Sequence, residues 1–210
     1  MSGLERVLPG SYPPMMKIPE TLSSVESLAQ VDPLARAVQR RVRRVLPEGP
    51  VYRALAGSWI GHPVHPLVVL VPIGSWMSAG ILDLLPRQQE AARRLILAGL
   101  VAAAPAVAAG LAEYRELDER GRRVGLVHAV ANTAASACYT VSYRLRRRGR
   151  TGAGKAWGML GLAAVSAGGA LGGHLTYAQG AGVFRWQARR YVEEHPPETA
   201  PRVGVSAGSR

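Results

Sequence analysis

Cysteine and aromatic residues are scarce in this chain. Cys138 is the single cysteine among 210 residues, Phe occurs once, and aromatic residues make up 6% of the sequence. One cysteine excludes an intrachain disulfide framework and a zinc ribbon, because both need several thiols. Since Cys138 stands in an apolar stretch, we interpret it as a small buried apolar residue. Ala and Gly supply much of the apolar content, and small residues suit helices that pack closely in lipid.

Acidic residues are also few, with 14 Asp and Glu against 26 Lys and Arg, so the net charge is +12. On a soluble protein this balance would indicate nucleic-acid binding. Here much of the positive charge flanks apolar stretches, where Lys and Arg meet lipid headgroups. We therefore expect the lipid bilayer as the partner and no nucleic acid.

Long apolar runs, by contrast, are plentiful. Four segments are each close to the roughly 20 residues that a helix needs to cross the hydrocarbon core, namely 66–85, 95–112, 124–143 and 156–178. A soluble domain of four such helices would have no polar outer face. The sequence therefore predicts an all-α integral membrane protein: a four-helix up-down-up-down transmembrane bundle whose two termini lie on the same side.

Prolines and glycines inside these spans bear on packing. Pro72 and Pro105 each remove a backbone hydrogen bond and are expected to kink their helices. In the fourth span, Gly168 with Gly172 and Gly169 with Gly173 are small-xxx-small spacings that let another backbone approach. A homo-oligomer is one of the assemblies that this glycine face allows.

The two ends of the chain are polar. We expect 1–54 to be an N-terminal arm, 55–183 the membrane domain, and 184–210 a disordered tail. The first 30 residues contain four prolines and no apolar core, which predicts that no signal peptide is present.

The N-terminal arm is predicted to contain a basic amphipathic helix over about 32–46. Asp32 and Pro33 form a good helix start, with a capping acid followed by Pro. An apolar stripe follows at Leu34, Val38, Val42 and Val45. The remaining positions include Arg36, Arg40, Arg43 and Arg44. A basic amphipathic helix beside a span favours the membrane interface; the alternative is a solvated charge run that packs on the bundle.

The loop charges bear on orientation. We call the side with both termini side X and the other side Y. The Y connections hold nine basic residues against Glu90: Arg87, Arg93, Arg94, Arg144, Arg146, Arg147, Arg148, Arg150 and Lys155. The positive-inside rule then places side Y in the cytoplasm. The arginines of the N-terminal arm argue for the reverse, so the orientation stays open.

Four of the five histidines converge on side X if the spans alternate in direction. His62 and His65 stand at the start of the first span, and Glu113 directly follows the second. His128 lies near the start of the third span and His174 near the end of the fourth. A rise of 1.5 Å per residue puts these last two about 6 Å inside the boundary. Because ionisable groups in a membrane are costly, they mark candidate functional sites.

The residue types in this layer favour metal chemistry. His and Glu bind Zn, Cu and Fe, and His binds haem iron. We predict His65, His128 and His174 as cofactor ligands, with His62 and Glu113 as further metal ligands. Two alternatives remain: a proton- or quinone-linked site without metal, and a structural hydrogen-bond cluster.

Three blocks that contain these histidines carry a family resemblance. GSWIGHPVHPLVVLVPIGSW, GLVHAVAN and GGHLTYAQGAGV occur in this order over about residues 55–183. They resemble the DUF2231 family of predicted bacterial membrane proteins. The resemblance implies four spans in a bacterial inner membrane and no settled function. Some relatives carry a Rieske-type iron–sulfur domain after the bundle, which implies a redox role by association, but this chain has one cysteine and no such domain.

Three functions follow as hypotheses. The first is a membrane redox protein that binds a b-type haem or a transition metal near side X and has a redox protein as its partner. The second is a structural or assembly subunit without chemistry of its own. The third, a transporter or channel, is weaker because four short spans provide little pathway. No nucleotide-binding loop, nucleophile–base pair or paired-carboxylate motif is apparent, so the sequence points away from a conventional enzyme.

Overall fold

A computed structural model describes residues 20–181, and this part of the chain is helical without any strand. The predicted tail at 184–210 lies outside the described residues, as do residues 1–19 of the arm. The short N-terminal helices are α1 (Glu20–Glu26), η1 (Ala29–Val31), α2 (Asp32–Val45), α3 (Pro50–Ala56) and α4 (His65–Val68). The longer helices are α5 (Leu70–Leu82), α6 (Gln89–Tyr114), α7 (Glu119–Arg147) and α8 (Thr151–Gly173). A π-helical turn, η2 (His174–Ala178), continues α8.

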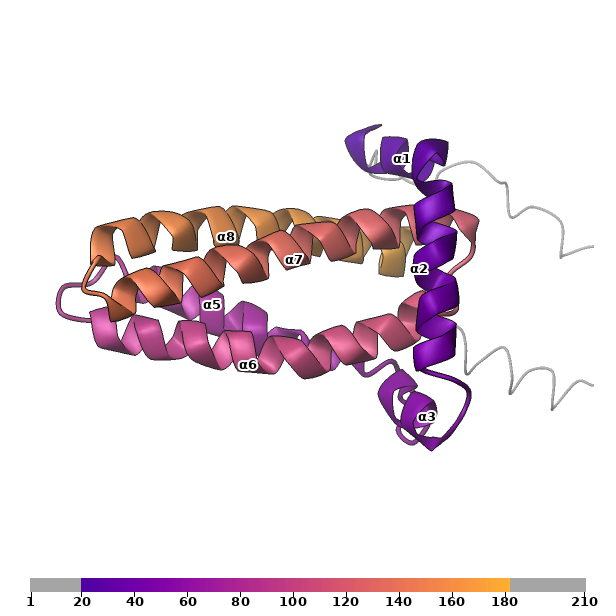
Figure 1. The fold of residues 1–210 in the computed structure, drawn as a ribbon, viewed down its shortest axis with the longest axis horizontal. Coiled ribbons are helices and arrows are strands. Elements are labelled where there is room, and N and C mark those ends of the chain that lie inside the picture. The colour runs from indigo at the N-terminus through magenta and orange to yellow at the C-terminus, as the bar shows by residue number, and fades with distance from the viewer. Residues whose placement is uncertain (1–19, 182–210) are drawn as a thin grey trace, which may run out of the picture.

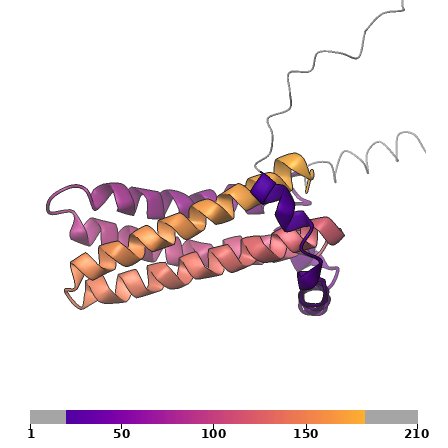
Figure 2. The ribbon, with the colours of Figure 1, turned by 90° about the horizontal axis from the view of Figure 1, so that it is seen from above.

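The helices α5 to α8 run side by side, and successive helices point in opposite directions (Figure 1). The most extensive contacts join α7 to α8 and α5 to α6, so the four helices form two hairpins. Figure 2 shows both hairpin turns at the same end, opposite the N-terminal helices. The turn from α6 to α7 and the end of α8 therefore lie at side X, together with α2.

Three of the described segments are long and apolar enough to cross a membrane: His65–Leu82, Gln89–Tyr114 and Thr151–Ala178. They correspond to the first, second and fourth predicted spans. The third predicted span falls on α7, which has the length but is less apolar. The reason is a series of polar residues in its middle, Asn132, Thr133, Ser136, Thr140 and Ser142.

The two prolines within the predicted spans have different effects. Helix α4 ends at Val68 and α5 begins at Leu70, so the break lies where the ring of Pro72 would meet the carbonyl four residues earlier. Pro105 lies inside α6, which continues to Tyr114. The break before Pro72 separates the turn that carries His65 from the rest of the first span.

The core between the four helices is built around Trp76 of α5 and Tyr139 of α7. Their rings are stacked, with centroids 4.3 Å apart, and both side chains are buried. The Trp76 indole donates a hydrogen bond to the carbonyl of Ile96 at 3.3 Å. It lies directly on Gly99 of α6, where a Cβ atom would come 2.6 Å from Trp76 Cδ1.

We expect Gly99→Ala to destabilise the protein by about 1–3 kcal/mol, because the added methyl group forces the stacked pair apart. Thermal unfolding in detergent, followed by tryptophan fluorescence, measures the change. Gly74→Ala is the matched control, since a Cβ there meets no atom within 4 Å. Equal melting temperatures for the two variants would contradict this view of the core.

Helix α2 lies across the X end of the bundle, where it crosses the ends of α6 and α7 (Figure 1). Gln39 of α2 is buried and its amide donates hydrogen bonds to the carbonyls of Arg115 at 3.0 Å and Leu117 at 2.9 Å. The last carbonyls of a helix have no hydrogen-bond partner within the helix. Gln39 therefore provides donors at the end of α6 and attaches α2 to the α6–α7 turn.

Candidate functional site

His65 begins α4 and faces α6. Its Nδ1 atom lies 2.8 Å from the carbonyl oxygen of Ala106. The ring lies against Gly110, where a Cβ would come 3.0 Å from His65 Cε1. A carbonyl oxygen only accepts hydrogen bonds, so Nδ1 carries the proton and Nε2 keeps its lone pair. Ala106 therefore sets both the orientation and the tautomer of this imidazole.

His128 of α7 is held on α8 in the same manner. Its Nδ1 atom lies 2.8 Å from the carbonyl oxygen of Gly168, and its ring lies against Gly172. Asn132, one turn later, donates to the His128 carbonyl at 2.9 Å, and its amide nitrogen lies 3.2 Å from His128 Nε2. The Gly168–Gly172 spacing thus serves α7 within this chain, whereas Gly169 is open.

The structure brings His65 and His128 together. Their ring centroids are 6.3 Å apart and the ring planes are nearly perpendicular, at 80°. The two rings come from α4 and α7 and lie in an edge-to-face contact.

The other predicted ligands lie elsewhere. His174 Nε2 is 2.5 Å from Glu26 Oε1 of α1, and the histidine side chain is buried. His62 is exposed, and Glu113 is half-buried near the end of α6. Among residues 20–181, no group of three His, Cys, Asp or Glu side chains is arranged to hold a metal ion. The predicted layer thus divides into a histidine pair and a separate His174–Glu26 contact.

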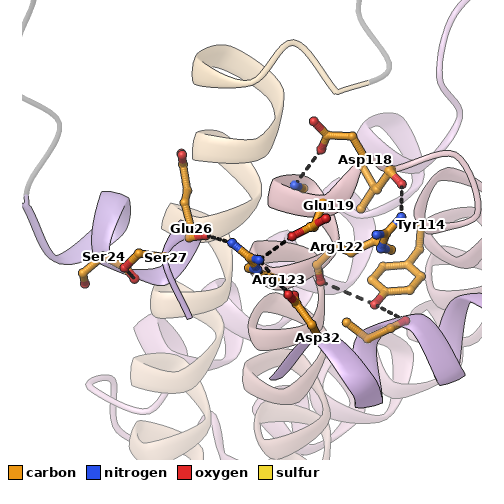
Figure 3. Close-up of polar contacts among 12 residues, drawn as sticks. Ser24, Glu26, Ser27, Asp32, Tyr114, Asp118, Glu119, Arg122 and Arg123 are labelled. Carbon is orange, nitrogen blue, oxygen red and sulfur yellow. Dashed lines mark hydrogen bonds and ion pairs between the residues drawn. The ribbon is translucent and has the colours of Figure 1, made fainter. Parts of the chain in front are cut away.

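Ion pairs join the N-terminal segments to the start of α7 at side X (Figure 3). Asp32 accepts two hydrogen bonds of 2.6 Å from the guanidinium of Arg123, which also binds Glu119 at 2.6 Å and the carbonyl of Glu26 at 2.8 Å. The carboxylate of Asp32 is therefore an ion-pair partner and makes no capping bond to α2, unlike the predicted role. The hydrogen bonds from Arg123 hold the pKa of the Asp32 carboxyl below its ordinary value.

The contact between Glu26 and His174 also involves Gln179. The nearby Gln179 side chain, opposed by burial and supported by the bond from His174, holds the pKa of Glu26 below its ordinary value. Glu26 therefore stays ionised in this contact at neutral pH. His174 thus joins the end of α8 to the N-terminal segment.

At side Y, the structure contains an ion pair that the loop charges do not suggest. Arg146 donates to Asp83 through both terminal nitrogens, at 2.7 and 2.5 Å, and the arginine side chain is 2% exposed. Ser142 bridges Arg146 and the Gly154 carbonyl, and Lys155 bonds the Asp83 carbonyl. Arg146 is one of the nine basic residues counted at side Y. Its charge is therefore neutralised within the bundle.

Sequence reasoning missed three of these partners. Asn132 stands four residues after His128, a spacing that predicts a shared helix face. Glu26 is 148 residues from His174, and no local pattern connects them. Arg146 stands in an arginine-rich run, where nothing in the sequence distinguishes it from its neighbours.

Comparison with known proteins gives one match. The family model described as "Predicted membrane protein (DUF2231)" matches residues 61–185, a segment that includes His62, His65, His128 and His174. No curated protein and no solved structure matches the chain.

Proposed function

This chain belongs to the DUF2231 family of predicted membrane proteins, and from that premise we propose that it is a four-span protein of the bacterial inner membrane with a metal centre at side X. The first span comprises α4 and α5, and the others are α6, α7 and α8. His65 and His128 hold the metal, most simply as the iron of a b-type haem, in a redox role.

The placement of α7 as the remaining span is supported by its hydrogen bonding. In lipid every polar group needs a partner within the protein. The polar side chains in the middle of α7 bond backbone carbonyls: Asn132, Thr133, Ser136, Thr140 and Ser142. With 29 residues, α7 is about 43 Å long, which fits a bilayer of about 40–45 Å including the headgroups.

The histidine pair carries the proposal of a metal centre. Two imidazoles from different helices are each fixed through Nδ1 by a carbonyl, and neighbouring groups that fix the ring favour metal binding. The Nε2 atoms would be the ligands, and Nε2 of His128 would exchange its 3.2 Å contact with the Asn132 amide for the metal. Tetrahedral zinc needs at least three protein ligands, and the described residues do not provide them here. A haem would need at most two ligands from side chains, and His65 and His128 would supply them, so this donor set fits haem better than zinc.

The residues around the pair have separate tasks in this proposal. His65 and His128 would hold the iron, while Ala106 and Gly168 keep the protons on Nδ1. Asn132 positions the turn of α7 that carries His128. A bound haem iron would supply one-electron chemistry, with a redox protein at side X as the partner.

A second candidate function rests on the same hydrogen bonds. His65 joins α4 to α6, His128 joins α7 to α8, and His174 joins η2 to α1. Each of these contacts joins two helices without any ligand. This pattern favours a structural or assembly subunit, whose histidines would be packing residues.

An ultraviolet–visible spectrum and metal analysis of the detergent-purified full chain separate the two functions. The redox proposal predicts a haem absorption band, or one equivalent of a transition metal per chain. A pure, folded preparation from membranes that contains neither would refute the metal centre and leave the structural function.

A further inference from the structure

Helix α2 is docked through one face only. Ala35, Gln39 and Val42 are its buried residues and pack on the α6–α7 turn. These positions are four and three residues apart, so they share one side of the helix. Val42 lies at the inner edge of the apolar stripe predicted from the sequence and is buried against the bundle, whereas Leu34 and Val45 lie at its outer edge.

The two flanks of α2 have opposite character. Positions in an α-helix advance by about 100°, so the residues beside the docked face divide into two sets. One flank carries arginines at intervals of four, Arg36, Arg40 and Arg44. The other flank carries the apolar residues Leu34, Val38 and Val45, with Arg41 at its outer edge. Helix α2 therefore has one face that packs on the bundle, one basic face and one apolar face.

Both flanks are mostly exposed among residues 20–181, although Val38 is half-buried and the charge of Arg36 acts on Asp32. Arg36, Arg40 and Arg44 are exposed and form no hydrogen bond or ion pair in the described part of the chain, whereas Arg43 bonds the Arg115 carbonyl. On the apolar flank, Leu34 is 58% and Val45 is 69% exposed. Exposed arginines and exposed aliphatic side chains on one short helix are typical of a helix at a membrane surface.

The position of α2 agrees with such a surface. It crosses the end of the bundle in Figure 1 and is seen end-on in Figure 2, so it runs parallel to the plane of a bilayer that the four helices would cross. Two exposed aromatic side chains belong to segments at the same end, Trp59 at 73% and Tyr177 at 90% exposure. Trp and Tyr are enriched where a protein meets the headgroups.

We infer that α2 is a preformed binding surface for anionic phospholipid headgroups. The arginine row binds the lipid phosphates, and the apolar flank enters the boundary with the acyl chains. The inference rests on the membrane placement proposed above. Because Gln39 and the Asp32–Arg123 pair already hold α2 in place, lipid binding does not have to order the helix, which favours affinity.

A lipid titration tests this surface. Full-length protein in an uncharged detergent is titrated with phosphatidylglycerol or with phosphatidylcholine, and the melting temperature is recorded. We expect phosphatidylglycerol to stabilise wild type and phosphatidylcholine to have little effect. In Arg36→Gln/Arg40→Gln/Arg44→Gln, we expect the half-saturating phosphatidylglycerol concentration to rise about 100-fold, since each arginine near an anionic surface contributes about fivefold.

Arg147→Gln/Arg148→Gln/Arg150→Gln is the matched control, because it removes the same charge from exposed positions at side Y. This variant should respond to phosphatidylglycerol as wild type does. An equal loss in both variants, or none in the α2 variant, would overturn the inference. If the α2 variant does not fold, a salt titration of the wild-type protein tests the inference instead. About 0.5 M salt should abolish the preference for phosphatidylglycerol over phosphatidylcholine. A preference that persists at this salt concentration would contradict binding by the arginine row.

Two further outcomes are distinguishable. If a short DNA duplex binds through the same arginines while phosphatidylglycerol gives no stabilisation, the surface is a nucleic-acid site and the lipid inference is wrong. If wild type is extracted from membranes by alkaline carbonate, the four-span placement itself fails. An integral protein without lipid preference would refute the role of α2 alone.

Discussion

We expect His128→Ala and His65→Ala each to abolish the haem or metal bound to the purified protein. In our proposal both imidazoles would hold the metal, and they come from different helices, so neither could replace the other. The measurement is the haem absorption band and the metal content per chain after purification in detergent. We expect a loss to near zero in each variant.

Matched variants separate ligation from packing. In His128→Asn the amide can still donate to the Gly168 carbonyl, as Nδ1 does at 2.8 Å, but the ligand atom Nε2 is gone. This variant should stay folded and lose the cofactor. His62→Ala and His174→Ala should retain it, because His62 is exposed and His174 binds Glu26. Cofactor retained in His128→Asn, or lost equally in His62→Ala, would refute the assigned ligands.

Arg146→Ala is expected to destabilise the protein by about 3–5 kcal/mol, because it leaves the Asp83 carboxylate without its partner in a low-dielectric surrounding. The pair joins the end of α5 to α7, and Ser142 extends the contact to α8. The free energy of unfolding can be measured by titration with a denaturing detergent, with tryptophan fluorescence as the signal.

Two comparisons define this effect. Glu90→Ala removes the two exposed ion pairs of Glu90 with Arg93 and Arg94 in α6 and should cost about 0.5–1 kcal/mol. The double variant Asp83→Leu/Arg146→Met removes both charges and should recover most of the stability, since a buried pair can be replaced by apolar residues at little cost. If Arg146→Ala cost no more than Glu90→Ala, the Asp83–Arg146 pair would not stabilise the bundle.

The histidines show which features of the site the sequence could predict. Chain direction and span length place His65 and His128 at one end, but depth along a helix does not specify the side that a residue faces. His65 and His128 face each other across the bundle, whereas His174 faces α1. The rotation of each helix about its axis depends on packing, for example of His128 on Gly172.

The apolar stripe of α2 illustrates the same limit. The helix itself follows from local signals, since Pro33 stands in its first turn and apolar residues recur at helical spacing. Which of these residues are buried depends on contacts with the distant α6–α7 turn, where Gln39 binds the carbonyls of Arg115 and Leu117. A polar residue is therefore buried on α2 while Leu34 and Val45 are exposed.

The sequence by itself determined the membrane character, the long apolar helices and the end of the bundle where the histidines gather, because apolar length and chain direction are local properties of the chain. Only the tertiary structure decided that two histidines form a pair, that His174 joins Glu26, and that Arg146 neutralises Asp83. These contacts depend on how each helix is rotated against its neighbours, and that rotation results from side-chain packing between segments far apart in the chain.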